Sequence, residues 1–139
     1  MKALVNDIKA RIKDPISNNE LSNLLFQLGH ENDIQDSIID IDITPNRGDC
    51  LSLLGILRDL KNFYQIDTKY ETHEEIIDSF NPNFFNECTE SCPNISFLKI
   101  EIDKTTSQYE EYLENYFSEL RNRKINLFTD ISNYLSYEL

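Results

Sequence analysis

The stretch from residue 41 to residue 56, IDITPNRGDCLSLLGI, changes its hydrophobic period within a few residues, and this change strongly constrains the fold. Before Pro45, apolar and polar side chains alternate, as in a strand with one buried face. After Asp49, the apolar side chains recur at helical spacing. Pro45 cannot donate a hydrogen bond to a strand ladder, so the strand ends there. The sequence therefore predicts a strand, a tight charged turn and a helix in direct succession.

Three residues of this turn, Asn46, Arg47 and Asp49, form the candidate site. Asn46 can take turn conformations that most residues resist, and Asp49 can cap a helix predicted over residues 50–64. Arg47 can pair with a carboxylate or donate to carbonyl oxygens. Two interpretations are open, a structural turn or interface and a ligand contact, and the residue types favour the first. Gly55, inside the predicted helix, would let another element approach closely.

The N-terminal part carries the strongest local helix signal. Ser17 and Glu20 have the spacing of a capping box, and the leucines that follow share one helical face. Gly29 then stands where a helix end favours a left-handed residue. A short helix or turn is expected over residues 7–12, and a strand over residues 37–44.

The second half of the chain has a weaker pattern at its start. Residues 67–91 are acidic and are interpreted as an irregular connector with one helical turn over residues 74–80. The remaining elements are predicted to be a strand over 95–102, a capping box from Ser107 to Glu110, an amphipathic helix to Arg121, a short strand over 125–131 and a helix from Ser132.

These patterns together predict an α+β chain. We expect a small N-terminal helix–strand–helix unit over residues 1–66, the acidic connector over 67–91, and the beginning of a second α+β domain over 92–139.

The charge of the chain limits its partners. It has 139 residues and a net charge of -12, so it repels phosphate backbones at long range. Independent binding of DNA or tRNA is therefore not expected. The N-terminus lacks the apolar segment of a signal peptide, and no run of residues is long and apolar enough to span a membrane. We interpret the chain as a cytoplasmic protein with no membrane partner.

The chemistry-bearing residues do not form a recognisable catalytic motif. The three cysteines are an odd number, so a disulfide framework is not expected. Cys88 and Cys92 have the spacing of half a zinc site, but no second half is visible, which favours incidental cysteines. His30 and His73 are interpreted as surface residues. The remaining candidates are the carboxylates of Asp40 and Asp42 on one strand face, for which a solvated outer face is favoured over paired catalytic carboxylates.

The stretch around the turn resembles a signature of the β subunit of bacterial phenylalanine–tRNA ligase. In that signature a strand ends in Thr-Pro-Asn-Arg, here residues 44–47. One residue follows, then Asp-Cys-Leu-Ser, here residues 49–52, and a Gly stands five residues after the Cys, here Gly55. The N-terminus resembles the start of the same family. The segment from Cys92 to the end resembles the entrance to its B3/B4 region.

The resemblance implies a non-catalytic role. A segment of this kind contributes scaffold and contacts to the α subunit, and it reaches tRNA(Phe) only through the whole enzyme. ATP and Mg²⁺ serve the whole enzyme, and the resemblance assigns no cofactor, metal or catalytic residue to these positions. The family's inserted tRNA-binding barrel has no room here, because only residues 31–37 separate the flanking elements. The family's editing pocket is formed by later residues.

Two alternatives stay open at this point. The chain can be a stand-alone protein-interaction module derived from such a subunit, with no ligase or editing activity. It can also be a decayed remnant without function, which would be expected to melt without cooperativity.

Overall fold

The computed structural model describes residues 1–66, 80–106 and 108–139. The chain divides into two compact units, one formed by Met1–Lys69 with Thr106–Leu139 and the other by Tyr70–Thr105. The structure is mixed α+β, with five helices and a three-stranded antiparallel sheet among the described residues, so the predicted fold class is confirmed. The expected division into domains at residues 66 and 91 stays a prediction.

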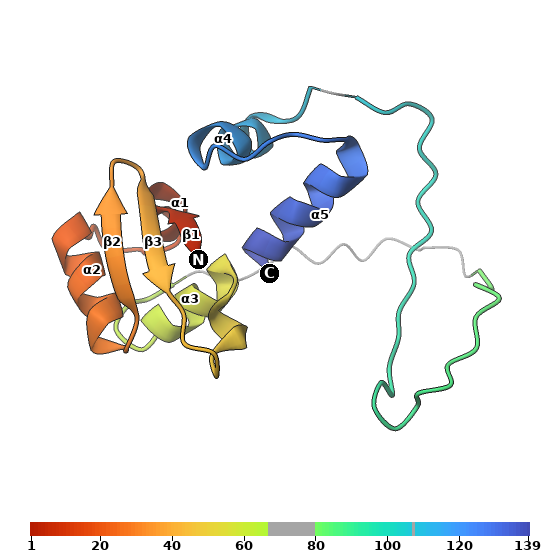
Figure 1. Cartoon of the computed structure of the whole chain (residues 1–139), viewed down its shortest axis with the longest axis horizontal. Helices are drawn as coiled ribbons and strands as arrows, with labels where there is room; N and C mark the ends of the chain where they lie inside the picture. Colours follow the sequence, from red (N-terminus) through yellow and green to blue (C-terminus); the bar gives the residue numbers. More distant parts are fainter. Residues whose placement is uncertain (67–79, 107) are drawn as a thin grey trace. The chain divides into compact units, whose positions relative to one another are not determined.

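The sheet contains β1 (Lys2–Leu4), β2 (Glu31–Gln35) and β3 (Ile38–Asp42), with β3 in the centre (Figure 1). The strand predicted over residues 37–44 is confirmed as β3. A two-residue turn joins β2 to β3, and its first residue, Asp36, has the positive φ (54°) that such a turn favours. Two strands were not predicted: β1, which is short, and β2, which is mostly polar.

Three helices of the N-terminal part cover this sheet: α1 (Val5–Ala10), α2 (Asn18–Gln27) and α3 (Leu53–Leu60). The alternation seen in the sequence buries one side of β3, because Ile39 and Ile41 are fully buried while Asp40 and Asp42 are exposed. The prediction that Asp40 and Asp42 lie on a solvated outer face is therefore confirmed. The central members of the core are Ile8, Leu21, Leu25, Ile39, Ile41, Leu53, Ile56, Leu57 and Leu60.

Both predicted ends of α2 are confirmed. The Ser17 hydroxyl accepts a hydrogen bond from the amide of Glu20 at 3.2 Å, which satisfies one free donor of the first turn. Gly29 ends the helix with φ +89°, a conformation that glycine adopts without strain. The other half of the predicted capping box is not shown: the Glu20 carboxylate accepts a hydrogen bond from the Tyr64 hydroxyl at 2.7 Å, which ties α2 to the segment after α3.

Two C-terminal helices, α4 (Glu111–Glu119) and α5 (Leu127–Glu138), belong to the same compact unit. Tyr137 donates its hydroxyl proton to Asp7 at 2.7 Å and accepts the amide of Leu4 at 3.2 Å. Glu138 pairs with Arg11 at 2.6 Å. These contacts join α5 to the start of the chain.

The second half corrects two predictions. Residues 95–102 are not a strand, because an alternating pattern becomes a strand only with a neighbour to pair with, and no described residue pairs with them. Residues 125–131 are not a strand either. Asn126 caps α5 there, since its side-chain oxygen accepts the Thr129 amide at 3.1 Å.

The predicted amphipathic helix that ends near Arg121 is confirmed as α4, which begins at Glu111. The predicted capping box from Ser107 to Glu110 was wrong, because Glu110 is itself the N-cap and its side chain makes no capping hydrogen bond. Ser107, His73 and the helical turn expected over residues 74–80, apart from Phe80, lie outside the described residues. Within the described ranges, no helix has the length and apolar character needed to cross a membrane.

Candidate functional site

The turn after β3 has a different backbone from the one predicted. The Arg47 amide donates to the Thr44 carbonyl at 2.9 Å, and a short 3-10 helix, η1 (Gly48–Cys50), follows. Asp49 lies within η1, and the N-cap of α3 is Ser52, whose hydroxyl accepts the Gly55 amide at 3.1 Å. The prediction that Asp49 caps this helix was therefore wrong, because the helix begins three residues later than expected.

Asn46 lies exposed in the turn and is not among the described residues with a positive φ. Its backbone conformation is therefore one that other residues also adopt. The special turn conformation predicted for it was wrong.

Gly55 permits close contact between α3 and η1, as predicted. A Cβ atom added at Gly55 would lie 1.9 Å from the Asp49 carbonyl oxygen and 2.9 Å from Cys50 Cα. Both of these neighbours are backbone atoms, so neither can move aside without distorting the turn. The glycine therefore fixes how closely the charged turn packs on the helix.

Arg47 pairs with two carboxylates, which confirms the predicted ion pairing. Its Nε donates to Asp49 Oδ1 at 3.0 Å, and its Nη2 donates to Asp59 Oδ2 at 2.6 Å. Arg58, one residue before Asp59 on α3, also contacts Asp49. The guanidinium of Arg47 thus bridges the turn and α3.

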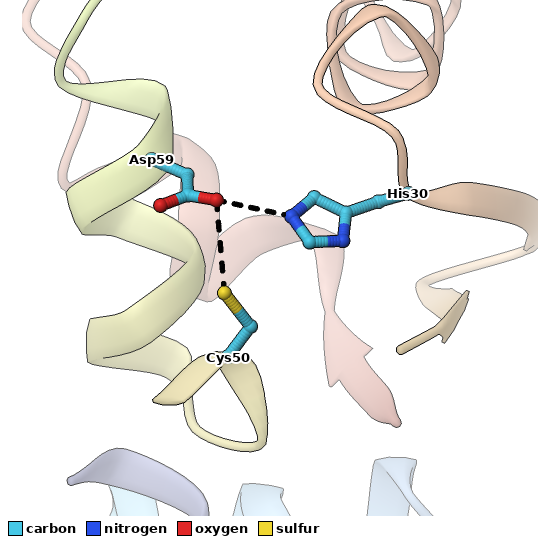
Figure 2. A group of neighbouring side chains, drawn as sticks. All are labelled: His30, Cys50 and Asp59. Carbon is cyan, nitrogen blue, oxygen red and sulfur yellow. Dashed lines mark hydrogen bonds and ion pairs between the residues drawn. The ribbon is translucent and has the colours of Figure 1, made fainter. Parts of the chain in front are cut away.

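Arg47, Asp49, Arg58 and Asp59 form a charge network. Two further residues, which were not predicted to belong to it, contact it at Asp59. His30 Nε2 lies 3.1 Å from Asp59 Oδ2, and Cys50 Sγ lies 3.6 Å from the same oxygen (Figure 2). The His30 side chain is only 2% exposed, so the interpretation of His30 as a surface residue was wrong. Gly29 turns the chain at the end of α2 and directs the next residue, His30, into the core.

The carboxylate of Asp59 is the centre of the network. Burial raises its pKa, but hydrogen bonds from Arg47 and then His30 outweigh this effect, and the pKa lies below its ordinary value. The pKa of Asp49 is also lowered, chiefly by its hydrogen bond with Arg47. Both carboxylates are therefore ionised at neutral pH and hold the guanidinium between them.

Cys50 is a poor nucleophile in this setting. Burial, followed by the negative charge of Asp59, raises the pKa of its thiol to about 11. Only the thiolate attacks electrophiles or binds metals, so the neutral thiol is unreactive near pH 7.

The arrangement of His30, Cys50 and Asp59 has the spacing of a metal site, since one ligand atom from each lies within 4.8 Å of the others. Zinc accepts this set of nitrogen, sulfur and oxygen donors. However, Arg47 Nη2 already lies 2.6 Å from Asp59 Oδ2 and 2.8 Å from Cys50 Sγ. A guanidinium therefore stands where a metal ion would have to bind, and the residues do not fit a metal without its displacement.

The other candidate ligands lie elsewhere. Cys88 and Cys92 are free and exposed in the second compact unit, and no described His, Cys, Asp or Glu joins them to make a metal-binding group.

The sequence is similar to curated β subunits of phenylalanine–tRNA ligase from bacteria. It is 33% identical to the subunit of Blochmanniella floridana over 110 residues, covering 75% of this chain and 13% of the relative. It is 30% identical to that of Idiomarina loihiensis over 108 residues, covering 76% and 14%. The identity rises to 54% with the subunit of Wolinella succinogenes over 41 residues, which are 29% of this chain and 5% of the relative.

The chain thus spans about one seventh of the length of the first two relatives, with 13% and 14% covered. No family model matches the chain, and no solved structure matches it.

Proposed function

We propose that this chain acts as the N-terminal, non-catalytic part of a phenylalanine–tRNA ligase β subunit. In this role it supports the attachment of phenylalanine to tRNA(Phe) in the cytoplasm by providing scaffold and subunit contacts. The main support is the similarity to bacterial β subunits over three quarters of the chain.

The charge network supports a scaffold role over a chemical one. The donors of Arg47 are occupied by Asp49 and Asp59, and the Cys50 thiol is protonated near neutral pH. No group of the network is both reactive and open to a substrate. Asn46 at the tip of the turn is exposed, and the side chains of Arg58 and Asp49 are 56% and 43% exposed.

We therefore propose that the turn containing Asn46, Arg47 and Asp49 is a structural corner with an interface at its exposed edge. Its partner would be the α subunit of the ligase. ATP, Mg²⁺ and tRNA(Phe) would be bound by the whole enzyme and not by this segment, whose net charge of -12 disfavours direct contact with phosphates.

A second candidate is a stand-alone interaction module derived from such a subunit, without ligase activity. One observation favours it: residues from both ends of the chain share one core, which includes Ile8 near the start and Tyr137 near the end. A chain with its own core can fold and bind a partner outside the enzyme.

The test is binding of the purified chain to the α subunit from the same cells, measured by co-elution in size-exclusion chromatography. We expect co-elution with the unmodified chain and weaker binding for Asn46→Arg at the tip of the turn. The matched control is Asn19→Arg, at another exposed asparagine, on α2. Equal binding by both variants would contradict the proposed interface, and no binding of the unmodified chain would favour the stand-alone module.

A further inference from the structure

The segment from Ile95 to Ile102 lies in the second compact unit and has the residue pattern of a strand, but no described residue pairs with it as a strand. It reads ISFLKIEI, and none of these residues belongs to a helix or strand. None makes a backbone hydrogen bond to another described residue. Its β-branched and aromatic residues nevertheless favour strand pairing.

In an extended conformation the side chains of this segment alternate between an apolar face and a mixed face. Leu98, Ile100 and Ile102 alternate along one face and are 65%, 68% and 45% exposed. Lys99 and Glu101 lie on the other face, where they form an ion pair with each other. That face also carries Ile95 and Phe97, and the Phe97 ring lies 5.0 Å from the Phe84 ring between centroids. An exposed apolar row beside unpaired backbone groups is a template for strand addition.

The charges of the segment select what can be added. The whole chain carries a net charge of -12, so two copies repel each other across most of their surfaces. Residues 95–104 contain two lysines and two acidic residues and are therefore neutral. This segment is a place where a second copy can approach without net repulsion.

One antiparallel register makes the segment complementary to itself. Pairing centred on Ile100 sets Leu98 opposite Ile102 of the second copy and Ile100 opposite its own counterpart. The same register sets Lys99 opposite Glu101 of the second copy, twice by symmetry. Shifting the register by two residues along either strand sets two lysines or two glutamates face to face, and parallel in-register pairing aligns like charges.

We propose that two copies of this chain associate through residues 95–102, which form an antiparallel, two-fold symmetric strand pair centred on Ile100. The contact is isologous, since each copy presents the same edge of residues 95–102 to the other. Each added backbone hydrogen bond gives affinity, and the Lys99–Glu101 pairs fix the register.

The first test is a charge-swap series on the full chain, followed by sedimentation equilibrium between micromolar and millimolar concentration. Lys99→Glu alone and Glu101→Lys alone each create two like-charge cross-strand pairs and should weaken association on the order of tenfold. The double variant Lys99→Glu with Glu101→Lys should restore it. A chain that stays monomeric throughout, or dimers indifferent to the swaps, would overturn the proposal.

The second test is independent of dimer affinity and uses disulfide trapping in a Cys88→Ser/Cys92→Ser background. Ile100→Cys should cross-link with itself, because directly opposed Cα atoms lie about 4.5–5.5 Å apart, within disulfide range. Leu98→Cys alone should not, because its counterpart lies about four residues along the pair, on the order of 13 Å away. Equal cross-linking at both positions would indicate random collision, and capture of another protein in place of a second copy would also contradict the pairing.

Discussion

The imidazole Nε2 of His30 lies 3.1 Å from Oδ2 of Asp59, across 29 positions of sequence. His30 follows the end of α2, and Asp59 lies near the end of α3. The same Asp59 oxygen accepts a hydrogen bond from Arg47 at 2.6 Å. One carboxylate therefore joins two helices and the turn that resembles the ligase signature, and its removal should affect all three.

Asp59→Asn should destabilise the fold strongly. The substitution removes the negative charge that Arg47 and His30 share, at a side chain that is only 15% exposed, and leaves Arg47 with Asp49 as its charged partner. Because Asp59 and Arg47 are both partly buried, the loss should be on the order of 1–3 kcal/mol, the range for a buried polar group that loses its partner. Urea unfolding followed by circular dichroism would measure the change in the free energy of unfolding.

Asp49→Asn is the matched control, because the Asp49 side chain is 43% exposed and its pairing with Arg47 is screened by water. Its cost should be clearly smaller than that of Asp59→Asn, because exposed ion pairs contribute little to stability. Equal costs for the two variants would contradict the central position given to Asp59.

The pH dependence of stability should carry the signature of Asp59. Its folded-state pKa is lower than the ordinary value of 3.8, so on acidification the unfolded state takes up the proton first. The stabilisation is therefore present above the unfolded pKa and is lost from about pH 5 downwards, through the folded pKa.

Urea midpoints at neutral and acidic pH would measure this loss, which should be smaller in Asp59→Asn. The comparison cancels the opposite contribution of Asp7, whose pKa is raised, chiefly by burial. Parallel pH profiles for the two proteins would contradict the lowered pKa.

Gly55→Ala should prevent correct packing of the turn on α3. The added Cβ would lie 1.9 Å from the Asp49 carbonyl oxygen, a contact that cannot be relieved by moving a side chain. We expect the free energy of unfolding to fall by about 3 kcal/mol or more, because the added atom overpacks the contact severely. Thermal unfolding would measure it.

Gly48→Ala provides the control in the same turn, because a Cβ there meets no atom within 4 Å and the residue has no positive φ. Its effect should stay within about 0.5–1 kcal/mol. A large loss of stability in Gly48→Ala with a small loss in Gly55→Ala would contradict the close packing of Gly55 on the turn.

The three thiols should react at very different rates. Cys88 and Cys92 are exposed, whereas Cys50 is buried and burial raises its pKa to about 11. Native protein at mildly alkaline pH should therefore release a chromophore from an aromatic disulfide reagent at two sites rapidly. The third thiol should react only after denaturation, and rapid reaction of all three in the folded protein would contradict the buried position of Cys50.

The parts of the fold that could be predicted are those with local signals. The alternation in β3, and the capping serine and terminal glycine of α2, are signals that depend only on neighbouring residues. Both elements are confirmed. β2, with the sequence ENDIQ, has too few apolar residues to predict a strand. It is a strand because its backbone pairs with that of β3.

The remaining errors also have physical causes. Residues 125–131 alternate enough to resemble a strand, but Asn126 can cap a helix and the apolar residues after it also fit helical spacing. The contact between His30 and Asp59 depends on how α2 and α3 pack, so no local pattern reports it. Arg47 was predicted to find a carboxylate, but only the fold identifies Asp59 as its deeper partner.

The most direct test of the proposed function is native mass spectrometry of the complex that forms around the tagged chain in its own cells. We predict that the chain is recovered with a phenylalanine–tRNA ligase α subunit in a fixed ratio, and that the Asp59→Asn variant, with its corner weakened, retains less of that subunit. Recovery of the folded chain without any α subunit would contradict its proposed place in the ligase.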